Sequence, residues 1–310
     1  MSTDLPKVSV VITCYNYGAY VASCLNSVCS QTFRDYEMII VNDGSTDNSE
    51  EQIKPYLNGW SVKYFKQENK GQANAKNRGI RESSGTHIAF LDADDVWAPE
   101  KLEKQMPLFH NERVGVVYSG QKFINHNGKV IPGHPLRKTL IRKSGKVTDA
   151  LFMDNFIPFS SAIVKRKCIE DFGGFDESLA MGIDWDLWLR ISTSYLFEFV
   201  DEPLLIYRIG HPGQMSKNET KRHECSDQIM AKFLEENPYV ISKRLLNDAM
   251  SFTYCNRAIY YSPRNLTLSN QYYKKSITLK PLQKASYIGI FKNIIKRALK
   301  IVTWFSRKYL

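Results

Sequence analysis

The sequence predicts an α/β fold in which a mostly parallel sheet carries helices on both faces. Short apolar segments rich in β-branched residues, at 8–13, 37–41 and 87–91, fit buried strands. Between them lie segments whose apolar residues recur at helical spacing. Strands and helices that alternate in this way are typical of a parallel sheet with crossover helices on its faces.

The expected elements of the first part of the chain alternate regularly. In order they are strand 8–13, helix 20–31, strand 37–41, a helix from Thr46 or Asp47 to about residue 57, a weaker strand 62–66, helix 71–81 and strand 87–91. The later part is less regular. We expect helix 99–110, strand 114–119, a loop and hairpin at 120–149, strand 162–165, helix 184–192, strand 197–207 and helices from about 226 onward. We place a boundary between a domain at 1–215 and a helical appendage at 216–310.

Composition excludes several classes of protein. Hydrophobic residues make up 43% of the 310 residues, which is enough for a core. No apolar run reaches the length of about 18 residues that a membrane-spanning helix needs. Residues 1–7 lack the apolar centre of a signal peptide, so we expect a cytoplasmic protein. The six cysteines are scattered without a C-x-x-C pair, as is typical of buried thiols rather than of disulfides or a zinc site.

Charge is distributed unevenly along the chain. The formal net charge is +10, yet residues 251–310 contain twelve Lys and Arg and no Asp or Glu. The rest of the chain is therefore close to neutral and slightly acidic. A basic block of this kind favours an anionic partner for the C-terminal region.

An acidic segment follows the strand at 87–91. Asp92, Asp94 and Asp95 stand at its carboxyl end, which is the edge where open α/β sheets bind ligands. Hard cations prefer carboxylate oxygens, so the segment suits Mg²⁺ or Mn²⁺ holding a phosphate. The alternative is that Asp94 or Asp95 caps the helix that begins near Pro99.

Seven short motifs then occur in one order between about residues 7 and 215. They occupy residues 10–16 (VVITCYN), 41–47 (VNDGSTD), 71–79 (GQANAKNRG), 91–95 (LDADD), 173–176 (GGFD), 184–190 (DWDLWLR) and 207–208 (YR). Together they resemble the motifs of family 2 glycosyltransferases of the GT-A fold. The resemblance implies a Rossmann-like, mixed but mostly parallel sheet. It also implies transfer of a sugar from a nucleotide-diphosphate donor with inversion of configuration.

The resemblance implies donor contacts at the ends of the first two strands. Thr13 and Tyr15 lie in the loop that holds the nucleotide in similar enzymes, with the Tyr15 ring near the base, where stacking is favourable. Asp43 would accept a hydrogen bond from the uracil N3–H of a UDP donor. The alternatives are that Tyr15 packs its own loop and that Asp43 forms a local turn.

Two basic residues are further candidates for donor binding. Lys76 and Arg78 lie on the expected helix at 71–81, from which both could approach the donor pyrophosphate. Similar enzymes usually carry Arg at the position of Lys76, so a bidentate contact is not expected there. The alternative for at least one of them is a solvated helix face.

For the metal, the resemblance makes residues 92–94 an Asp-x-Asp motif. It implies that Asp94 coordinates Mn²⁺ or Mg²⁺ directly, that Asp92 contacts the ribose or the ion, and that the ion neutralises charge on the departing UDP. Asp95 would support this pair or cap a helix. His211 lies where similar enzymes place a group near the diphosphate and is a candidate ligand. The alternative is an exposed loop histidine.

Asp184 matches the catalytic aspartate of similar enzymes, which would take the proton from the acceptor hydroxyl as its oxygen attacks the anomeric carbon. Its alternative role is a helix N-cap. Ile183 stands where the family commonly has an acid, and an apolar neighbour could raise the pKa of Asp184. We interpret Asp186 and Arg190 as a surface helix pair.

The sequence pattern of residues 286–310 predicts an amphipathic helix with basic residues on one side and apolar residues on the other. This pattern is typical of a helix in a membrane interface. The alternative is a helix that packs its apolar stripe on the domain. No recognised nucleic-acid motif accompanies the charge, so we expect no nucleic-acid partner.

The leading hypothesis is a metal-dependent, inverting glycosyltransferase. It would use a UDP-sugar and a glycan or lipid-linked acceptor in surface polysaccharide synthesis, peripherally on the inner face of the cytoplasmic membrane. A non-catalytic nucleotide-sugar or membrane binding module of the same fold is the alternative. A nucleotidyltransferase is a weaker one, because residues 13–20 do not form a Gly-rich basic loop.

Overall fold

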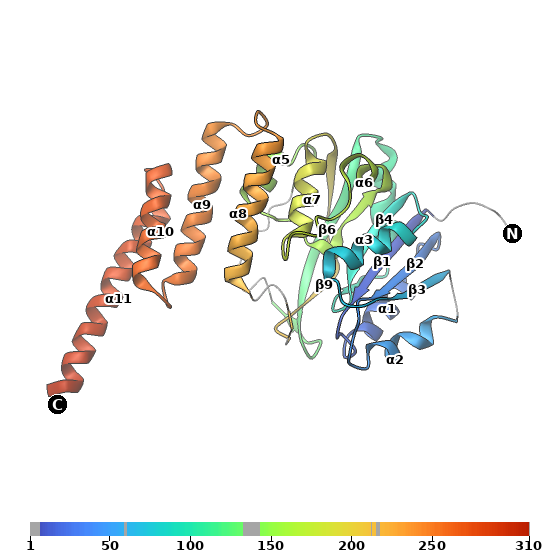
Figure 1. Ribbon diagram of the computed structural model, residues 1–310, viewed down its shortest axis with the longest axis horizontal. Helices are drawn as coiled ribbons and strands as arrows, with labels where there is room; N and C mark the ends of the chain where they lie inside the picture. Colours follow the sequence, from blue (N-terminus) through green and yellow to red (C-terminus); the bar gives the residue numbers. More distant parts are fainter. Residues whose placement is uncertain (1–6, 59–60, 133–142, 212, 215–217, 310) are drawn as a thin grey trace. The chain divides into compact units, whose positions relative to one another are not determined.

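The structure is a computed structural model that describes residues 7–58, 61–132, 143–211, 213–214 and 218–309, with side chains described as far as residue 299. The chain divides into two compact units (Figure 1). The first, here the sheet unit, comprises Met1–Thr148 and Phe156–Phe233; the second, the helical unit, comprises Asp149–Asn155 and Leu234–Leu310. The functional division into residues 1–215 and 216–310 remains a proposal.

One mixed sheet organises the sheet unit. In the part of the chain that the structure describes, nine strands join it in the order β3-β2-β1-β4-β8-β6-β9-β5, with β7 paired to β6. The strands are β1 (Val8–Cys14), β2 (Tyr36–Asn42), β3 (Val62–Lys66), β4 (His87–Asp92), β5 (Val96–Trp97), β6 (Val114–Asn125), β7 (Val130–Ile131), β8 (Ile163–Lys165) and β9 (Leu196–Ile209). The four strands β3, β2, β1 and β4 are parallel to one another, and β8 pairs antiparallel with both β4 and β6.

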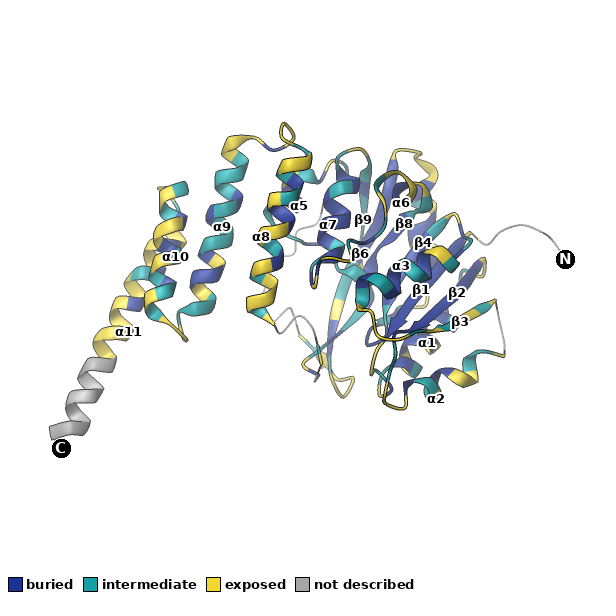
Figure 2. Ribbon diagram, in the orientation of Figure 1, coloured by how far each residue is buried: buried dark blue, intermediate teal, exposed yellow. Residues whose placement is uncertain are grey.

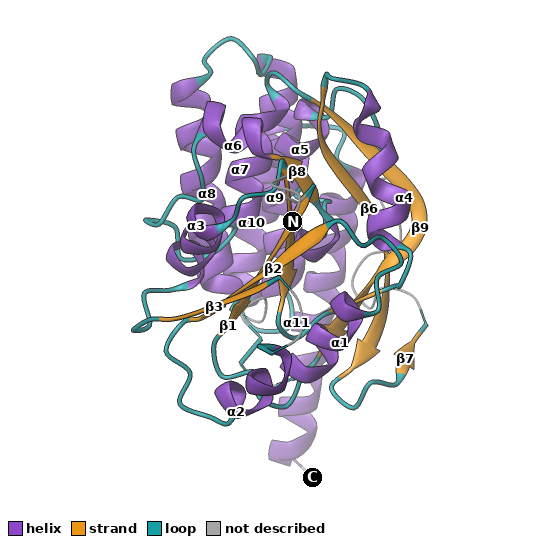
Figure 3. Ribbon diagram, turned by 90° about the vertical axis from the view of Figure 1, so that its right-hand side faces the viewer, coloured by secondary structure: helices purple, strands orange, loops and turns teal. Residues whose placement is uncertain are grey.

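Helices cover both faces of this sheet (Figure 3). The helices of the sheet unit are α1 (Val21–Cys29), α2 (Ser49–Ile53), α3 (Gln72–Glu82), α4 (Lys101–Gln105), α6 (Arg166–Phe172), α7 (Ile183–Ser192) and most of α8 (Glu219–Glu236), which contacts α7 through Lys232, together with the 3-10 helices η1 (Lys54–Tyr56), η2 (Met106–His110) and η3 (Phe159–Ser161). Residues of α1, α2 and α4 share a core with one face of β1, β2 and β4. The mixed α/β fold predicted from the sequence is therefore confirmed.

Burial on both faces explains the composition of the central strands. Every residue of β1 and β2 is buried, as Figure 2 shows for the sheet in general. Strands covered on both sides read as continuous apolar runs rather than as alternating patterns. On the face opposite α1, helix α3 approaches β1 closely at Gly79. A Cβ at this position would lie 2.3 Å from Val11 Cγ1, so the close packing requires glycine.

Two expected helices are shorter than predicted, and both are interrupted at a proline. The helix expected to reach residue 57 is α2, followed by the 3-10 turn η1, which contains Pro55. The helix expected at 99–110 is α4 followed by η2, which contains Pro107. Proline lacks the N–H that would continue the helical hydrogen-bond pattern, so a tighter turn replaces it.

The strand expected at 114–119 is longer than predicted. As β6 it continues to Asn125 and forms a hairpin with β7. The hairpin agrees with the expectation for residues 120–149, although residues 133–142 of that region lie outside the described residues.

The helical unit contains α5 (Thr148–Met153) from its second residue onward, the last residues of α8, α9 (Lys243–Tyr261), α10 (Leu266–Leu279) and α11 (Lys284–Tyr309). Ser242 and Asn265 cap α9 and α10, each accepting a hydrogen bond from a backbone N–H of the first turn. Among the described residues, no helix is both long and apolar enough to cross a bilayer.

Candidate active site

Three carboxylates gather where β4 ends. Asp92, Asp94 and Asp95 each offer an oxygen, and these three atoms lie within 4.8 Å of one another. Because β1 and β4 are parallel neighbours, Thr13 lies directly beside Asp92 in the sheet register. The carboxyl ends of the central strands therefore form one edge that carries the acids, as the sequence predicts for an open α/β sheet.

Asp95 is turned into the protein. Its two carboxylate oxygens accept hydrogen bonds from Ser160 Oγ at 2.7 Å and from the backbone N–H of Arg208 at 3.0 Å. Burial and the neighbouring carboxylates of Asp94 and Asp92 raise its pKa well above the usual range. Asp95 thus ties β4 to η3 and β9. It does not cap α4, which begins at Lys101.

A buried lysine compensates Asp92. Lys76, on α3, is 4% exposed and donates to Asp92 Oδ1 at 2.9 Å and to Thr13 Oγ1 at 3.2 Å. Burial raises the pKa of Asp92; the Lys76 cation acts against this rise, and the Asp94 carboxylate adds to it. Lys76 is therefore held against the acidic edge rather than on a solvated helix face.

His211 meets the cluster from the end of β9. Its Nε2 lies 2.8 Å from Asp94 Oδ2, and the residue is fully buried. The rings of Tyr17 and Tyr20 pack around the imidazole, with ring centroids at 5.6 and 5.1 Å. The alternative of an exposed loop histidine is therefore wrong, because the aromatic loop after β1 covers it.

Arg208 holds this corner together, a role that the sequence analysis did not identify. Its guanidinium donates to the backbone carbonyls of Asp94, Asn125 and His126, and it lies over the Tyr20 ring at 4.7 Å. The residue is only 6% exposed. It fixes the turn that carries Asp94, and its Nε and Nη1 donors are used within the protein.

Asp43 organises the neighbouring loop. Its carboxylate accepts from Gln67 Nε2 at 2.8 Å and from the backbone N–H groups of Lys70 and Gly71 at 3.0 and 2.9 Å. A carboxylate has about four acceptor positions, so roughly one stays available for a ligand. Asp43 therefore orders the segment after β3 rather than a turn of its own. Gln67 was not singled out from the sequence, because nothing local marks it as a partner of Asp43.

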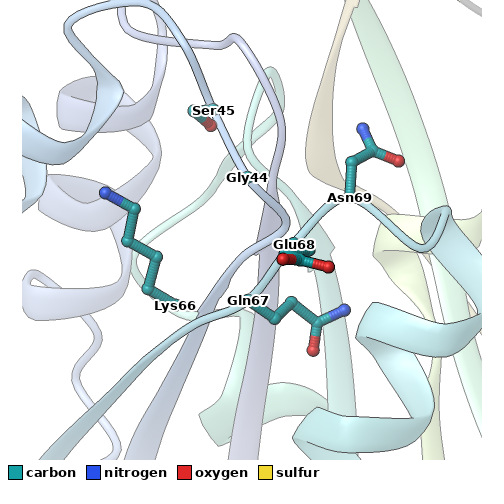
Figure 4. A pocket seen from close by; sticks show the side chains of 6 residues that line it. All are labelled: Gly44, Ser45, Lys66, Gln67, Glu68 and Asn69. Atoms are coloured by element: carbon teal, nitrogen blue, oxygen red, sulfur yellow. The ribbon is translucent and has the colours of Figure 1, made fainter.

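A pocket lies beside Asp43, between the ends of β2 and β3 (Figure 4). The residues that line it are Gly44, Ser45, Lys66, Gln67, Glu68 and Asn69. Gln67 also donates to Asn74 of α3 at 3.0 Å. Its side chain is thus fixed between this loop and the helix.

The contacts of Arg78 and the exposure of Tyr15 separate these two residues from the acidic cluster. Arg78 donates to Lys66 O and to Gln67 Oε1, each at 3.2 Å, and lies over the Phe65 ring at 5.1 Å. It therefore faces the end of β3, whereas Lys76 on the same helix faces β4. Tyr15 is 44% exposed in the loop after β1.

Asp184 lies in the first turn of α7. The N-cap residue of this helix is Gly182, in the left-handed conformation with φ 73°, so the alternative role of Asp184 as a bare N-cap is wrong. A carboxylate in the first turn is stabilised by the helix dipole. Just before α7, the carbonyl of Ala180 accepts from Gln72 Nε2 at 3.4 Å. Asp184 is the second residue of α7, four residues after the contact of Ala180 with the first residue of α3, the helix that carries Lys76.

The other acid of α7 has a structural part. Asp186 is 3% exposed and accepts from Arg190 at 2.6 Å and from Lys232 of α8 at 3.3 Å. Lys232 also donates to Asp176 at 2.6 Å. The expected pair of Asp186 with Arg190 is confirmed, but its placement at the surface was wrong, because Lys232 of α8 contacts Asp186 on this side of α7.

The sequence of residues 9–172, more than half of the chain, matches Glycosyl transferase family 2. The chain belongs to this family.

Individual relatives are also similar to the chain. A protein of Rickettsia bellii described as an uncharacterized glycosyltransferase is 30% identical over 240 residues, which is 76% of this chain and 34% of the relative. The chain thus spans about a third of that relative's length. A second relative, from Methanocaldococcus jannaschii and also described as an uncharacterized glycosyltransferase, is 33% identical over 66% of this chain and 72% of its own. Chondroitin synthase of Escherichia coli is 29% identical over 64% of this chain and 28% of its own.

Solved structures share the fold. Residues 1–349 of S. aureus TarS in complex with UDP-GlcNAc match with a TM-score of 0.68 and 18% identity, covering 93% of this chain and 89% of that one. The mannosyltransferase PcManGT of Pyrobaculum calidifontis in complex with GDP-Man and Mn²⁺ matches with a TM-score of 0.60 and 17% identity, covering 96% and 87%. This family 2 glycosyltransferase therefore has a GT-A-like fold, as its motifs implied.

Proposed function

We propose that the protein is an inverting glycosyltransferase that uses a nucleotide-diphosphate sugar, most simply a UDP-sugar, and the hydroxyl of a glycan or lipid-linked acceptor in surface polysaccharide synthesis. The single observation that carries this proposal is the shared edge of β2, β1 and β4. Asp43, Thr13 and Asp92 lie at or next to the carboxyl ends of these three adjacent parallel strands, and Lys76 links the last two. Groups for a base and for a diphosphate thus stand along one sheet edge.

The donor base is assigned to the Asp43 side. Uracil presents an N–H flanked by two carbonyls, and a carboxylate accepts from such an N–H, whereas the Watson–Crick edge of cytosine offers only acceptors beside its amino group. Tyr15, being exposed, has a free ring face for stacking. Lys76 and Arg78 are the proposed cations for the phosphates, with Arg78 reaching from the β3 side. Both UDP-GlcNAc and GDP-Man occur in the complexes of the structural relatives.

The cluster fits a divalent cation. Asp94, Asp92 and His211 supply two carboxylates and an imidazole, which are ligands that Mn²⁺ accepts and, for the carboxylates, that Mg²⁺ prefers. Asp95 would not bind the ion directly, since both of its oxygens are engaged by Ser160 and Arg208. When bound, the ion would neutralise negative charge on the diphosphate.

Asp184 is the proposed catalytic base. As the acceptor oxygen attacks the anomeric carbon and the bond to the diphosphate breaks on the opposite side, Asp184 takes the hydroxyl proton. A single displacement of this geometry inverts the anomeric configuration. Ile183 is 2% exposed, so the position where the family commonly has an acid contributes only apolar packing here.

The proposed setting is the cytoplasmic face of the membrane. A lipid-linked acceptor would lie there, and the basic region of residues 286–310 would provide peripheral attachment, with no nucleic-acid partner. The absence of an acid at Ile183 also supports a second candidate, a non-catalytic nucleotide-sugar binding module of the same fold. The two candidates differ in turnover and not in donor binding.

A thermal-shift screen of UDP- and GDP-sugars, each with and without Mn²⁺, tests the proposal. A ligand present at 100 times its Kd stabilises the native state by about 2.7 kcal/mol. We expect a UDP-sugar to raise the melting temperature, and more so with Mn²⁺. If no nucleotide sugar shifts it under either condition, the proposal fails. A donor that binds but never releases its nucleotide in the presence of any acceptor would favour the binding module.

A further inference from the structure

Helix α11 packs on the helical unit through small polar residues. Ser286 Oγ donates to Ser276 Oγ of α10 at 2.9 Å. Asn293, two turns further along, donates to Ser269 Oγ at 2.9 Å and accepts from Ser262 Oγ at 2.7 Å. Both Ser286 and Asn293 are buried, at 0% and 1% exposure. These bonds fix which side of α11 faces the unit.

A glycine brings α11 close to α10 on this same side. Gly289 lies between Ser286 and Asn293 on the helix surface, and a Cβ there would lie 2.1 Å from the Tyr273 ring. Tyr273 is itself buried, beside Cys255 and Ala258. The interface of α11 therefore consists of small and polar groups together with the partly buried Ile290, which packs against the same cluster, and the rotation of the helix about its axis is determined.

The opposite side of α11 is apolar and exposed. We call its side chains the α11 stripe; they are Tyr287 (51% exposed), Ile288 (55%), Phe291 (64%), Ile294 (58%), Ile295 (44%) and Leu299 (59%). The sequence left open whether the apolar side of this helix packs on the domain. In the part of the helix whose side chains are described, only Ile290 at its margin packs on the core of the unit, because Ser286, Gly289 and Asn293 occupy the rest of the interface. The predicted pattern at residues 300–310 lies outside those side chains.

The charge around the stripe indicates its partner. Lys284 and Lys292 of the same helix are exposed beside the stripe, whereas Lys296 donates to Ser262 Oγ at 2.8 Å. Residues 251–310 contain no Asp or Glu. A second copy of the chain docking stripe to stripe would bring two basic helices together without a carboxylate to pair them, which is unfavourable. An anionic bilayer surface complements both features, since it receives the apolar side chains and attracts the lysines.

We propose that the α11 stripe and its flanking basic residues bind the surface of a bilayer that contains anionic lipid. The helix lies in the headgroup region with Phe291, Ile288 and Ile295 directed into the acyl boundary. The polar interface with α10 keeps the helix attached to its unit while the apolar side faces outward. This inference specifies the membrane partner of the proposed function, and it requires neither donor nor catalysis.

Co-sedimentation of the full chain with vesicles tests the inference. We expect binding to vesicles of phosphatidylcholine mixed with phosphatidylglycerol, much weaker binding to phosphatidylcholine alone, and loss of binding as salt rises. Replacing Ile288, Phe291 and Ile295 by Ser should weaken partitioning by about 100-fold or more. Lys284→Gln with Lys292→Gln should weaken it by about 30-fold, at about fivefold per charge.

The controls separate the stripe from general surface properties. Ile259→Ser removes an apolar side chain of α9 that is also 54% exposed, and Lys274→Gln removes a charge from α10; both variants should bind like the unchanged protein. Circular dichroism checks that each variant is folded, and the salt dependence of the unchanged protein needs no variant. Three results would overturn the inference: no binding to anionic vesicles, equal binding to both vesicle types, or a dimer that only the triple Ser variant abolishes. Failure of donor binding would leave this result unaffected.

Discussion

At the residue scale, the site combines clustered acids with two buried cations, Lys76 and Arg208. Lys76 bridges Thr13 and Asp92 and also lies 4.7 Å from the centre of the Phe159 ring. Three carboxylates within 4.8 Å of one another repel. In the protein without a bound metal ion, the Lys76 cation offsets this repulsion at Asp92. A similar enzyme with Arg at this position could fork between two acceptors, whereas Lys provides a compact point charge.

We predict that Lys76→Met lowers the free energy of unfolding by about 3 kcal/mol near neutral pH, because it leaves the Asp92 carboxylate without its buried partner. Urea denaturation measures the loss. Added Mn²⁺ should recover more stability in this variant than in the unchanged protein, since the cluster is then more negative. Lys76→Arg keeps the charge and serves as the control. Equal urea midpoints for Lys76→Met and the unchanged protein would show that Lys76 does not balance the cluster.

Sequence reasoning located the acids but not their partners. Asp92, Asp94 and His211 were predicted from their place in the motifs, and the structure brings them together. Ser160 and Arg208, which engage Asp95, lie 65 and 113 residues away from it along the chain. No local pattern links such positions, because only the sheet order brings β9 and η3 to the end of β4. The buried state of His211 was missed for the same reason.

At the element scale, α7 is positioned by α8. Lys232 of α8 contacts both Asp186 of α7 and Asp176 of the loop before it, and Arg190 donates to Asp186 and to the carbonyl of Gly174. The helix that carries the proposed base in its first turn is therefore held by an ion-pair network. The sequence showed the pair at i and i+4 but not Lys232, which lies 46 residues from Asp186.

We predict that Lys232→Met lowers the free energy of unfolding by about 2 kcal/mol near pH 7. This loss is smaller than the loss on breaking a fully buried ion pair, because Lys232 is partly exposed. Burial acts to raise the pKa of Asp176, but hydrogen bonds from Lys232 and Ser178 hold it at about 2, below the ordinary 3.8. A carboxylate whose pKa is lower in the folded than in the unfolded state stabilises the fold at pH values above its pKa in the unfolded state. That contribution is lost as pH falls from about 4 toward 2.

The difference in the free energy of unfolding between Lys232→Met and the unchanged protein should therefore become smaller as the pH is lowered from about 5. Urea titrations at a series of pH values measure it. Lys232→Arg keeps a cation and should retain most of the stability. If the difference stayed constant down to about pH 3, the pair with Asp176 would not be its source.

At the scale of the whole molecule, the sheet was predictable in its first half and less so beyond β4. Each buried apolar run up to residue 92 became a parallel strand, because short crossovers with helices allow little else. The antiparallel insertion of the three-residue strand β8 between β4 and β6 has no such local cause. The GT-A resemblance supplied the mixed sheet that periodicity alone did not.

In the helical unit, the sequence predicted a helix but not which of its sides is buried. Its amphipathic pattern at 286–310 was evident, but which side of α11 packs was not. The answer depended on Ser276, Ser269 and Tyr273 of α10, which complement Ser286, Asn293 and Gly289. Periodicity places residues on a common side of a helix, and only the neighbouring helix decides which side is buried.

The most direct test of the account separates donor binding from transfer in two variants, Asp94→Ala and Asp184→Asn, with Glu51→Gln as an exposed control. With the nucleotide sugar found in the thermal-shift screen, Asp94→Ala should lose the Mn²⁺-dependent stabilisation and the release of nucleotide. Asp184→Asn should keep the stabilisation but lose turnover by about 100-fold or more, because it keeps the shape of the side chain and removes the base. Turnover at the unchanged rate in both variants would contradict the assignment of the acidic edge and of Asp184 to one reaction.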